Sequence, residues 1–270
     1  MKKMIPFLVM AMVGFTSAFG QSKEVRSVGT FTKISFRVPG KLVVRQGSPQ
    51  KVEIEGDKTT LSKIETEVKG DRLMIGNEEK WNWGWRDSER IMVYITVKDI
   101  TGLSVSGSGE LITEGRINTD QIDLNVSGSG SLQTDINSSG GLEANVSGSG
   151  RIDVKGNCRS IESDISGSGR VSASLTIKEG ASIDISGSGK FEGSGTANEI
   201  KTNISGSGKV YASNLEVDKC DIRISGSGDV EINVKSELDA NISGSGSVSY
   251  KGNPSHVRGN SSGSGKVRKM

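Results

Sequence analysis

Histidine, aromatic residues and long apolar runs are scarce in this 270-residue sequence. Aromatic residues make up 4% of the chain, hydrophobic residues make up 33%, and His256 is the only histidine. A Ser-His-Asp triad would have to use His256, which no nucleophile-elbow sequence accompanies. With 37 glycines and so few apolar residues, the chain is unsuited to a broad globular core. Its apolar residues are enough for a thin, elongated core. We predict that the protein is not an enzyme.

An excess of one charge is also missing. The sequence holds 34 basic and 32 acidic side chains, and Lys2 and Lys3 of the N-terminal segment account for the difference. A chain without a general positive field has little to attract nucleic acid, so we expect no nucleic-acid partner. After this segment no stretch is apolar and long enough for a membrane-spanning helix, so we expect no transmembrane segment in the mature chain.

The first 20 residues have the pattern of a secretory signal peptide. Lys2 and Lys3 precede an apolar stretch over residues 4–15, and Ala18 and Gly20 supply the small residues of a cleavage site. No cysteine follows this stretch closely, so the lipid attachment of a bacterial lipoprotein is not expected. We predict a signal peptide over residues 1–20 and an exported mature chain, located in the periplasm or at the cell surface or outside the cell.

The motif Ser-Gly-Ser-Gly occurs nine times, and its copies are 18 to 21 residues apart. Such a period indicates a solenoid, in which each repeat buries its apolar side only by stacking on its neighbours. A disordered Gly/Ser chain is the alternative, but such a chain has no reason to keep a period. The copies begin at Ser106, Ser127, Ser147, Ser166, Ser186, Ser205, Ser225, Ser243 and Ser262.

Apolar residues alternate with polar ones on both sides of each motif. In the second copy, Val126 and Leu132 have the same alternate phase as Gly128 and Gly130. Alternate side chains of a strand point to opposite faces, so both glycines are expected to point inward, at a narrow corner without room for a Cβ atom. The glycines predicted at such corners are Gly107, Gly109, Gly128, Gly130, Gly148, Gly150, Gly167, Gly169, Gly187, Gly189, Gly206, Gly208, Gly226, Gly228, Gly244 and Gly246.

This layout predicts an all-β fold, a single-stranded parallel β-helix with about nine regular coils of 18 to 21 residues over residues 101–270. Each coil has an inward strand, a glycine corner, a second inward strand and a less regular return. Residues 21–100 are expected to form irregular N-terminal coils or a cap of the same domain, in which FRVPGKLVV and EVKGDRLMI are shorter versions of strand, glycine corner and strand. Leucine-rich repeats, propellers and calcium-binding nonapeptide coils need other periods or residues.

The N-terminal strands followed by serial [VI]SGSGx[VI] resemble the head GIN domain family of putative auto-transporter adhesins, found in exported proteins of Bacteroidetes. The resemblance covers roughly Phe31 to Tyr250. It implies a right-handed single-stranded β-helix, a surface or periplasmic location and an adhesin-like role.

The two cysteines, Cys158 and Cys220, invite a disulfide in an exported protein. Cys220 takes an inward position of the repeat, and Cys158 lies about three coils earlier. At about 4.8 Å per coil the rise between them is roughly 14 Å, whereas a disulfide needs α-carbons within about 7 Å. We therefore predict two unpaired thiols.

Four carboxylates are expected to gather on one face of neighbouring coils, because they precede the motif by two or four residues. Carboxylates about 5 Å apart suit a retaining glycosidase, and grouped oxygen ligands suit calcium. The alternative is a solvated surface, screened by a basic column of Arg151, Arg170, Lys190 and Lys209 just past the corner. We expect no cofactor, with calcium as the candidate that this cluster leaves open. The four residues are Glu143, Glu162, Asp164 and Asp184.

All three tryptophans, Trp81, Trp83 and Trp85, lie in the stretch KWNWGWRD. Alternation would place them on one face of an extended segment, where aromatic rings stack on sugars or anchor protein partners. Alternatively, this insertion folds over the first coils and caps them.

These observations favour a non-enzymatic, exported β-helix protein that presents a surface for binding a glycan or an envelope protein. Two alternatives stay open. One is a carbohydrate-active enzyme that uses Glu162, Asp164 and Asp184, and the other is a passive structural element of the cell envelope.

Overall fold

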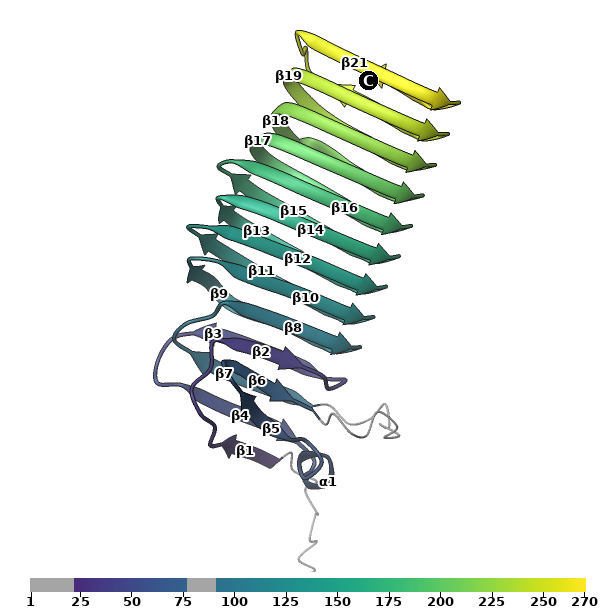
Figure 1. The fold of residues 1–270 in the computed structure, drawn as a ribbon. Coiled ribbons are helices and arrows are strands. Elements are labelled where there is room, and N and C mark those ends of the chain that lie inside the picture. The colour runs from purple at the N-terminus through teal and green to yellow at the C-terminus, as the bar shows by residue number, and fades with distance from the viewer. Residues whose placement is uncertain (1–21, 77–90) are drawn as a thin grey trace, which may run out of the picture.

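The computed structural model describes residues 22–76 and 91–270, which form a parallel β-solenoid of about eight turns (Figure 1). The serial motif predicts this all-β fold and nearly this number of coils. The solenoid rises from the N-terminal strands to the last coil at the C-terminus, with one motif corner in each coil of the repeat region (Figure 1). The long axis of the molecule therefore follows the sequence through the repeats.

The repeat region consists of two stacks of parallel strands joined at the glycine corners. One strand of each coil ends on the first glycine of the motif, and the next strand begins just after the second. Their bounds are β8 (Gly102–Gly107), β9 (Glu110–Thr119), β10 (Ile122–Gly128), β11 (Ser131–Ser138), β12 (Gly141–Gly148), β13 (Arg151–Cys158), β14 (Ser160–Gly167), β15 (Arg170–Ile177), β16 (Gly180–Gly187), β17 (Lys190–Gly206), β18 (Lys209–Gly226), β19 (Asp229–Gly244), β20 (Ser247–Lys251), β21 (His256–Gly263) and β22 (Lys266–Lys269).

The coils stack in register, so equivalent residues of the repeat lie directly above one another. Val126 of β10 pairs with Val105 of β8 below and with Val146 of β12 above, and the motif serines and glycines pair in the same way. The inward residues of these columns form one continuous apolar core along the solenoid. Burial of this shared core holds each coil to its neighbours, because no single coil has enough apolar surface of its own.

In the N-terminal coils the order of the strands in the stack differs from their order in the sequence. Their elements are β1 (Ser22–Arg26), β2 (Lys33–Phe36), β3 (Lys41–Gln46), β4 (Lys51–Gly56), α1 (Lys58–Leu61), β5 (Thr66–Lys69), β6 (Arg72–Ile75) and β7 (Met92–Val97). Strands β2 and β3 pair with β8 and β9 on one side and with β6 and β7 on the other. The chain thus passes below its first coil before it returns to begin the repeats.

One prediction for this region is right and another is wrong. FRVPGKLVV forms a coil corner between β2 and β3, both of which continue the parallel stacks. EVKGDRLMI forms an antiparallel hairpin of β5 and β6 instead of a corner, with Gly70 at a left-handed φ of 64° in its turn. Strand alternation looks the same in both segments, and only the pairing partner distinguishes a corner from a hairpin.

The two glycines of each motif have different roles, which corrects the prediction that both point inward. The second glycine is buried, and a Cβ atom on Gly130 would lie 2.7 Å from Val105 Cγ1 and 2.6 Å from the carbonyl oxygen of Gly109. The first glycine is only partly buried and turns the chain through a left-handed backbone, with φ of 105° at Gly128. This positive φ breaks the strict alternation that the sequence prediction carried through the corner.

Substituting either glycine should destabilise the solenoid, for different reasons. Gly130→Val introduces a side chain into occupied core space, and Gly128→Val forces a branched residue into a left-handed backbone. We expect each variant to lower the free energy of unfolding by about 1–3 kcal/mol, measured by denaturant titration. The control is Ser129→Val between them, whose side chain is exposed. Equal stability of all three variants would contradict this account of the corner.

Both cysteines are unpaired and buried, as the spacing of the coils predicts. Burial raises the pKa of the Cys158 thiol to about 11. Burial, and to a smaller extent the carboxylate of Asp221, also raise the pKa of Cys220. Both residues therefore serve the core as small apolar side chains at neutral pH.

The two thiols should resist modification in the folded protein. Iodoacetamide at pH 8 is expected to label neither cysteine until denaturant is added, because both thiols are buried and protonated. Stability should fall as the pH rises above about 9, since the unfolded thiols then ionise while the folded ones do not. Mass spectrometry measures the labelling, and a native mass lower by two hydrogens would reveal a disulfide instead.

Candidate functional site

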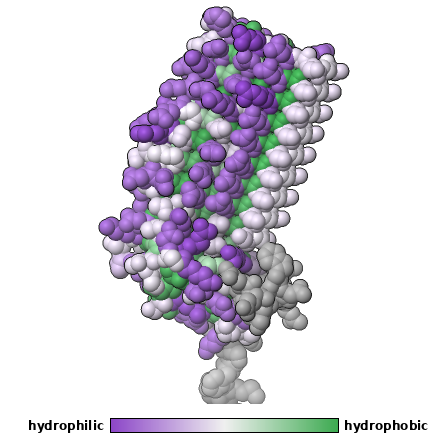
Figure 2. Space-filling model, viewed as in Figure 1, coloured by the Kyte–Doolittle hydropathy of each residue, from purple (hydrophilic) through white to green (hydrophobic). Residues whose placement is uncertain are grey.

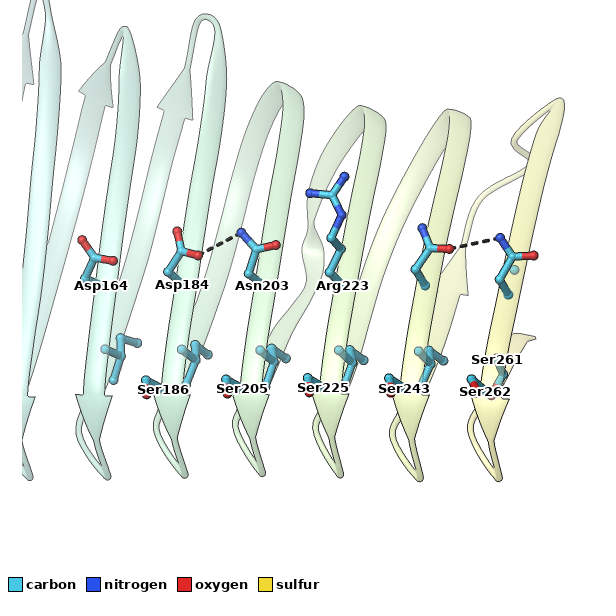
Figure 3. Close-up of a pocket in the computed structure, with 18 of the residues that line it drawn as sticks. Asp164, Asp184, Ser186, Asn203, Ser205, Arg223, Ser225, Ser243, Ser261 and Ser262 are labelled. Atoms are coloured by element: carbon cyan, nitrogen blue, oxygen red, sulfur yellow. Dashed lines mark hydrogen bonds between the residues drawn. The ribbon is translucent and has the colours of Figure 1, made fainter.

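A groove of about 880 Å³ runs along one face of the solenoid. It crosses the C-terminal halves of β14, β16, β17, β18, β19 and β21, just before the glycine corner (Figure 3). Each coil contributes three consecutive residues, which hold the same positions relative to the motif in every coil. The repeat thereby builds a groove with three parallel columns of side chains.

The first column carries hydrogen-bonding and charged groups that point out of the strand face (Figure 3). Asn203 Nδ2 donates to Asp184 Oδ1 at 2.9 Å, and Asn260 Nδ2 donates to Asn241 Oδ1 at 3.0 Å. The guanidinium of Arg223 is paired with Asp221 at 2.9 Å, within its own strand. In order, the column is Asp164, Asp184, Asn203, Arg223, Asn241 and Asn260.

The second column is apolar and forms the floor of the groove. Its isoleucines point into the core and are only 1–3% exposed, so they present a narrow edge to the groove. Figure 2 shows a green hydrophobic stripe along the molecule beside the pale columns of the corner. The column is Ile165, Ile185, Ile204, Ile224 and Ile242, and it ends in Ser261.

The third column consists of the first serine of each motif, which is exposed. Within residues 22–76 and 91–270, these hydroxyls form no hydrogen bond with other protein groups, so they are available to a ligand. The column is Ser166, Ser186, Ser205, Ser225, Ser243 and Ser262. The groove therefore pairs a polar wall and a hydroxyl wall across an apolar floor.

The four predicted acidic residues are divided between two places. Asp164 and Asp184 are neighbours in the groove, whereas Glu143 and Glu162 pair on β12 and β14 and line a separate hollow of about 380 Å³. In the described parts of the chain, no three Asp, Glu, His or Cys side chains form a group that could hold a metal ion. Calcium binding stays a prediction, for which the described residues provide no set of ligands around one point.

The basic column forms as predicted, but it does not screen the acidic residues. Arg151, Arg170, Lys190 and Lys209 lie in register on β13, β15, β17 and β18, on the strand after the corner. Their ion pairs are made with Asp153, Glu192 and Asp229 of the same strands or the next coil. The column lies just past the corner, as predicted, but its ion pairs are made on that side of the corner and not with the acidic residues before it.

The remaining predicted site residues, Trp81, Trp83 and Trp85, lie outside the described residues. The groove was not predicted as a site, although its signal is present in the sequence. The recurring triplet of Asn or Asp, Ile and Ser directly before Gly defines its three columns, with Arg223 and Ser261 as the exceptions. Of this triplet, only the carboxylates belong to the predicted site. Its amides, isoleucines and serines form the rest of the groove.

No helix among the described residues could span a membrane; the one helix there, α1, has four residues.

Comparison with protein families gives a match over most of the chain. The family described as "Putative auto-transporter adhesin, head GIN domain" matches residues 30–192 and 178–254. A comparison with curated proteins gives no match.

Several solved structures have the same fold. A putative lipid binding protein from Parabacteroides distasonis is 22% identical, with 93% of this chain and 96% of that chain covered and a TM-score of 0.69. A putative adhesin from the same species is 22% identical, with 94% of this chain and 98% of that chain covered and a TM-score of 0.69. A putative adhesin from Parabacteroides merdae is 21% identical, with 93% of this chain and 96% of that chain covered and a TM-score of 0.66. At these identities the likeness establishes the shared fold alone.

Proposed function

Because the chain belongs to the head GIN domain family of putative auto-transporter adhesins, we propose that it is an exported, non-enzymatic binding protein that holds an extended glycan in its groove. The groove of about 880 Å³ carries this proposal. Its length over six strands suits a linear ligand better than a compact one. The signal-peptide pattern of residues 1–20 supports export to the periplasm or the cell surface.

The chemistry of the groove suits an uncharged sugar chain. Sugar hydroxyls can bond with the amides of Asn203 and Asn241 on one wall and with the serine hydroxyls on the other. The C–H faces of the rings can pack on the isoleucine floor, which excludes water from part of the contact. Because the columns repeat at about 4.8 Å, successive sugar units meet the same isoleucine floor and the same serine wall, and many weak contacts add up.

Filling the groove should abolish glycan binding. In the double variant Ser205→Leu and Ser225→Leu, bulk enters the groove without a ring on which a sugar could stack. We expect at least about a tenfold loss of affinity, measured by affinity electrophoresis or calorimetry with the neutral polysaccharides that bind the wild type in a screen of envelope and host glycans.

The matched control is Ser207→Leu with Ser227→Leu, which changes the second serine of the same two motifs. Those residues do not line the groove. Equal losses in both double variants, or no neutral polysaccharide bound in the screen, would contradict the groove as the binding site. Circular dichroism and denaturant titration establish that all four substitutions leave the fold intact.

The same screen tests the enzymatic alternative. Asp164 and Asp184 lie side by side in the groove, as a carboxylate pair for sugar cleavage would require. Release of reducing ends from a polysaccharide, lost in Asp164→Asn or Asp184→Asn, would overturn the non-enzymatic proposal. Absence of both binding and cleavage would leave a passive envelope role.

The tryptophan cluster is a separate prediction. Replacing Trp81, Trp83 and Trp85 together with alanine should weaken glycan or cell binding if these rings contact the ligand, since stacked aromatics contribute large apolar area. The measurement is the same binding assay, run beside the groove variants. Unchanged affinity together with a lowered melting temperature would identify the cluster as a cap of the first coils.

A further inference from the structure

A further hollow, of about 390 Å³, lies on the other side of the glycine corner and is distinct from the groove. One wall is the column of second motif serines, which includes Ser149, Ser168 and Ser188. The opposite wall is formed by Arg151, Arg170 and Lys190, which lie in register on β13, β15 and β17. Gly150 and Gly169 lie between the walls and have no side chain to fill the space.

The hydrogen-bond donors of both walls are largely unused. In the described parts of the chain, the guanidinium groups of Arg151 and Arg170 donate no hydrogen bond to protein, and neither do the hydroxyls of the serine wall. Arg116, on the same face, is different, since it donates to both carboxylate oxygens of Asp135 at 2.8 and 3.4 Å. The cations of the hollow are held by ion pairs and, for Lys190, by the ring of Tyr211 at 5.2 Å, so a ligand competes only with these contacts.

The carboxylates next to this wall only partly neutralise it. Arg151 lies 3.3 Å from Asp153, Arg170 lies 3.7 Å from Glu192, and Lys190 shares the same Glu192 at 4.0 Å. Two carboxylates thus face three cations, through long contacts between side chains that are one third to one half exposed. Such exposed pairs contribute little, so an incoming anion competes with them at low cost.

We propose that this hollow, the cationic track, binds a linear anionic polysaccharide that carries a carboxylate or sulfate on successive sugars. Cations on consecutive coils repeat at about 4.8 Å, close to the length of one sugar unit in an extended chain. Arginine forks bind carboxylate and sulfate oxygens in pairs, and the serine hydroxyls opposite them bind the sugar hydroxyls. The track goes beyond the proposed function because its residues, its face of the solenoid and its ligand charge all differ from those of the groove.

The lining of the track favours a polysaccharide over a single-stranded nucleic acid. Proteins that bind single strands combine a basic groove with aromatic rings on which the bases stack. The residues that line the track are serine, glycine, arginine and lysine, and the ring of Tyr211, 5.2 Å from Lys190 Nζ, is already in contact with that ammonium. Sugar units need no stacking partner where hydroxyl and cationic donors bracket the chain.

The test uses polygalacturonate and dextran sulfate as anionic probes, with fully methyl-esterified polygalacturonate as the uncharged counterpart. The triple variant Arg151→Gln, Arg170→Gln and Lys190→Gln should bind the anionic probe roughly eight- to 27-fold more weakly, because three contacts of two- to threefold each multiply. Binding by the wild type should weaken as salt rises and should be absent with the esterified probe.

The matched control is Lys178→Gln, Lys201→Gln and Lys219→Gln, which removes the same charge away from the track. It should change the affinity by less than about twofold, and the leucine variants of the groove should leave this affinity unchanged. If both charge variants lost affinity equally, the loss would be an effect of net charge alone, and the proposal would be overturned. So would failure of both anionic probes to bind, or tighter binding of oligothymidylate than of either probe.

Discussion

The structure depends on the close stacking of glycine corners. At each corner the backbones of successive coils approach until a Cβ atom on Gly128 would lie 2.8 Å from the carbonyl oxygen of Gly107. The serine amide after Gly128 donates to that same oxygen at 2.8 Å, so the corner continues the backbone ladder through the turn. Any side chain there would separate the coils and break the ladder. The corner thereby fixes the register of every strand that leads into it and out of it.

This fixed register explains why the surface of the solenoid consists of columns. Once the corners align, residues at equal distance from the motif stack about 4.8 Å apart, except beyond the register shifts between β9 and β11 and in β17 to β19. Some columns hydrogen-bond along their length, such as Asn118, Asn137 and Asn157, in which each amide donates to the residue below. The groove and the cationic track are columns of the same kind that leave part of their hydrogen-bonding capacity unused.

The sequence predicted the repeat region well because alternation and period determine it together. The inward positions Val126 and Leu132 are buried as predicted. Alternation could not show that the first glycine of each motif takes a positive φ, because that conformation ends the two-residue period at that point. Nor could it show that β5 and β6 pair with each other or that the chain passes below β2, since pairing partners depend on tertiary contacts. The acidic residues lie on the predicted columns, but the spacing could not show that the basic column past the corner pairs with carboxylates on its own side instead of screening them.

The corner also lets one repeat carry two different surfaces. The residues before it and those after it belong to the same coil, yet they point to faces on opposite sides of the bend. A substitution in the column of Asn203 therefore leaves the column of Arg170 in place, because both are held by the inward residues and the glycines and not by each other. On such a frame the outward columns can change with little loss of stability, since exposed substitutions away from caps and strained sites usually cost less than about 0.5 kcal/mol. The corner can thus hold one fold while the chemistry of the outward columns changes.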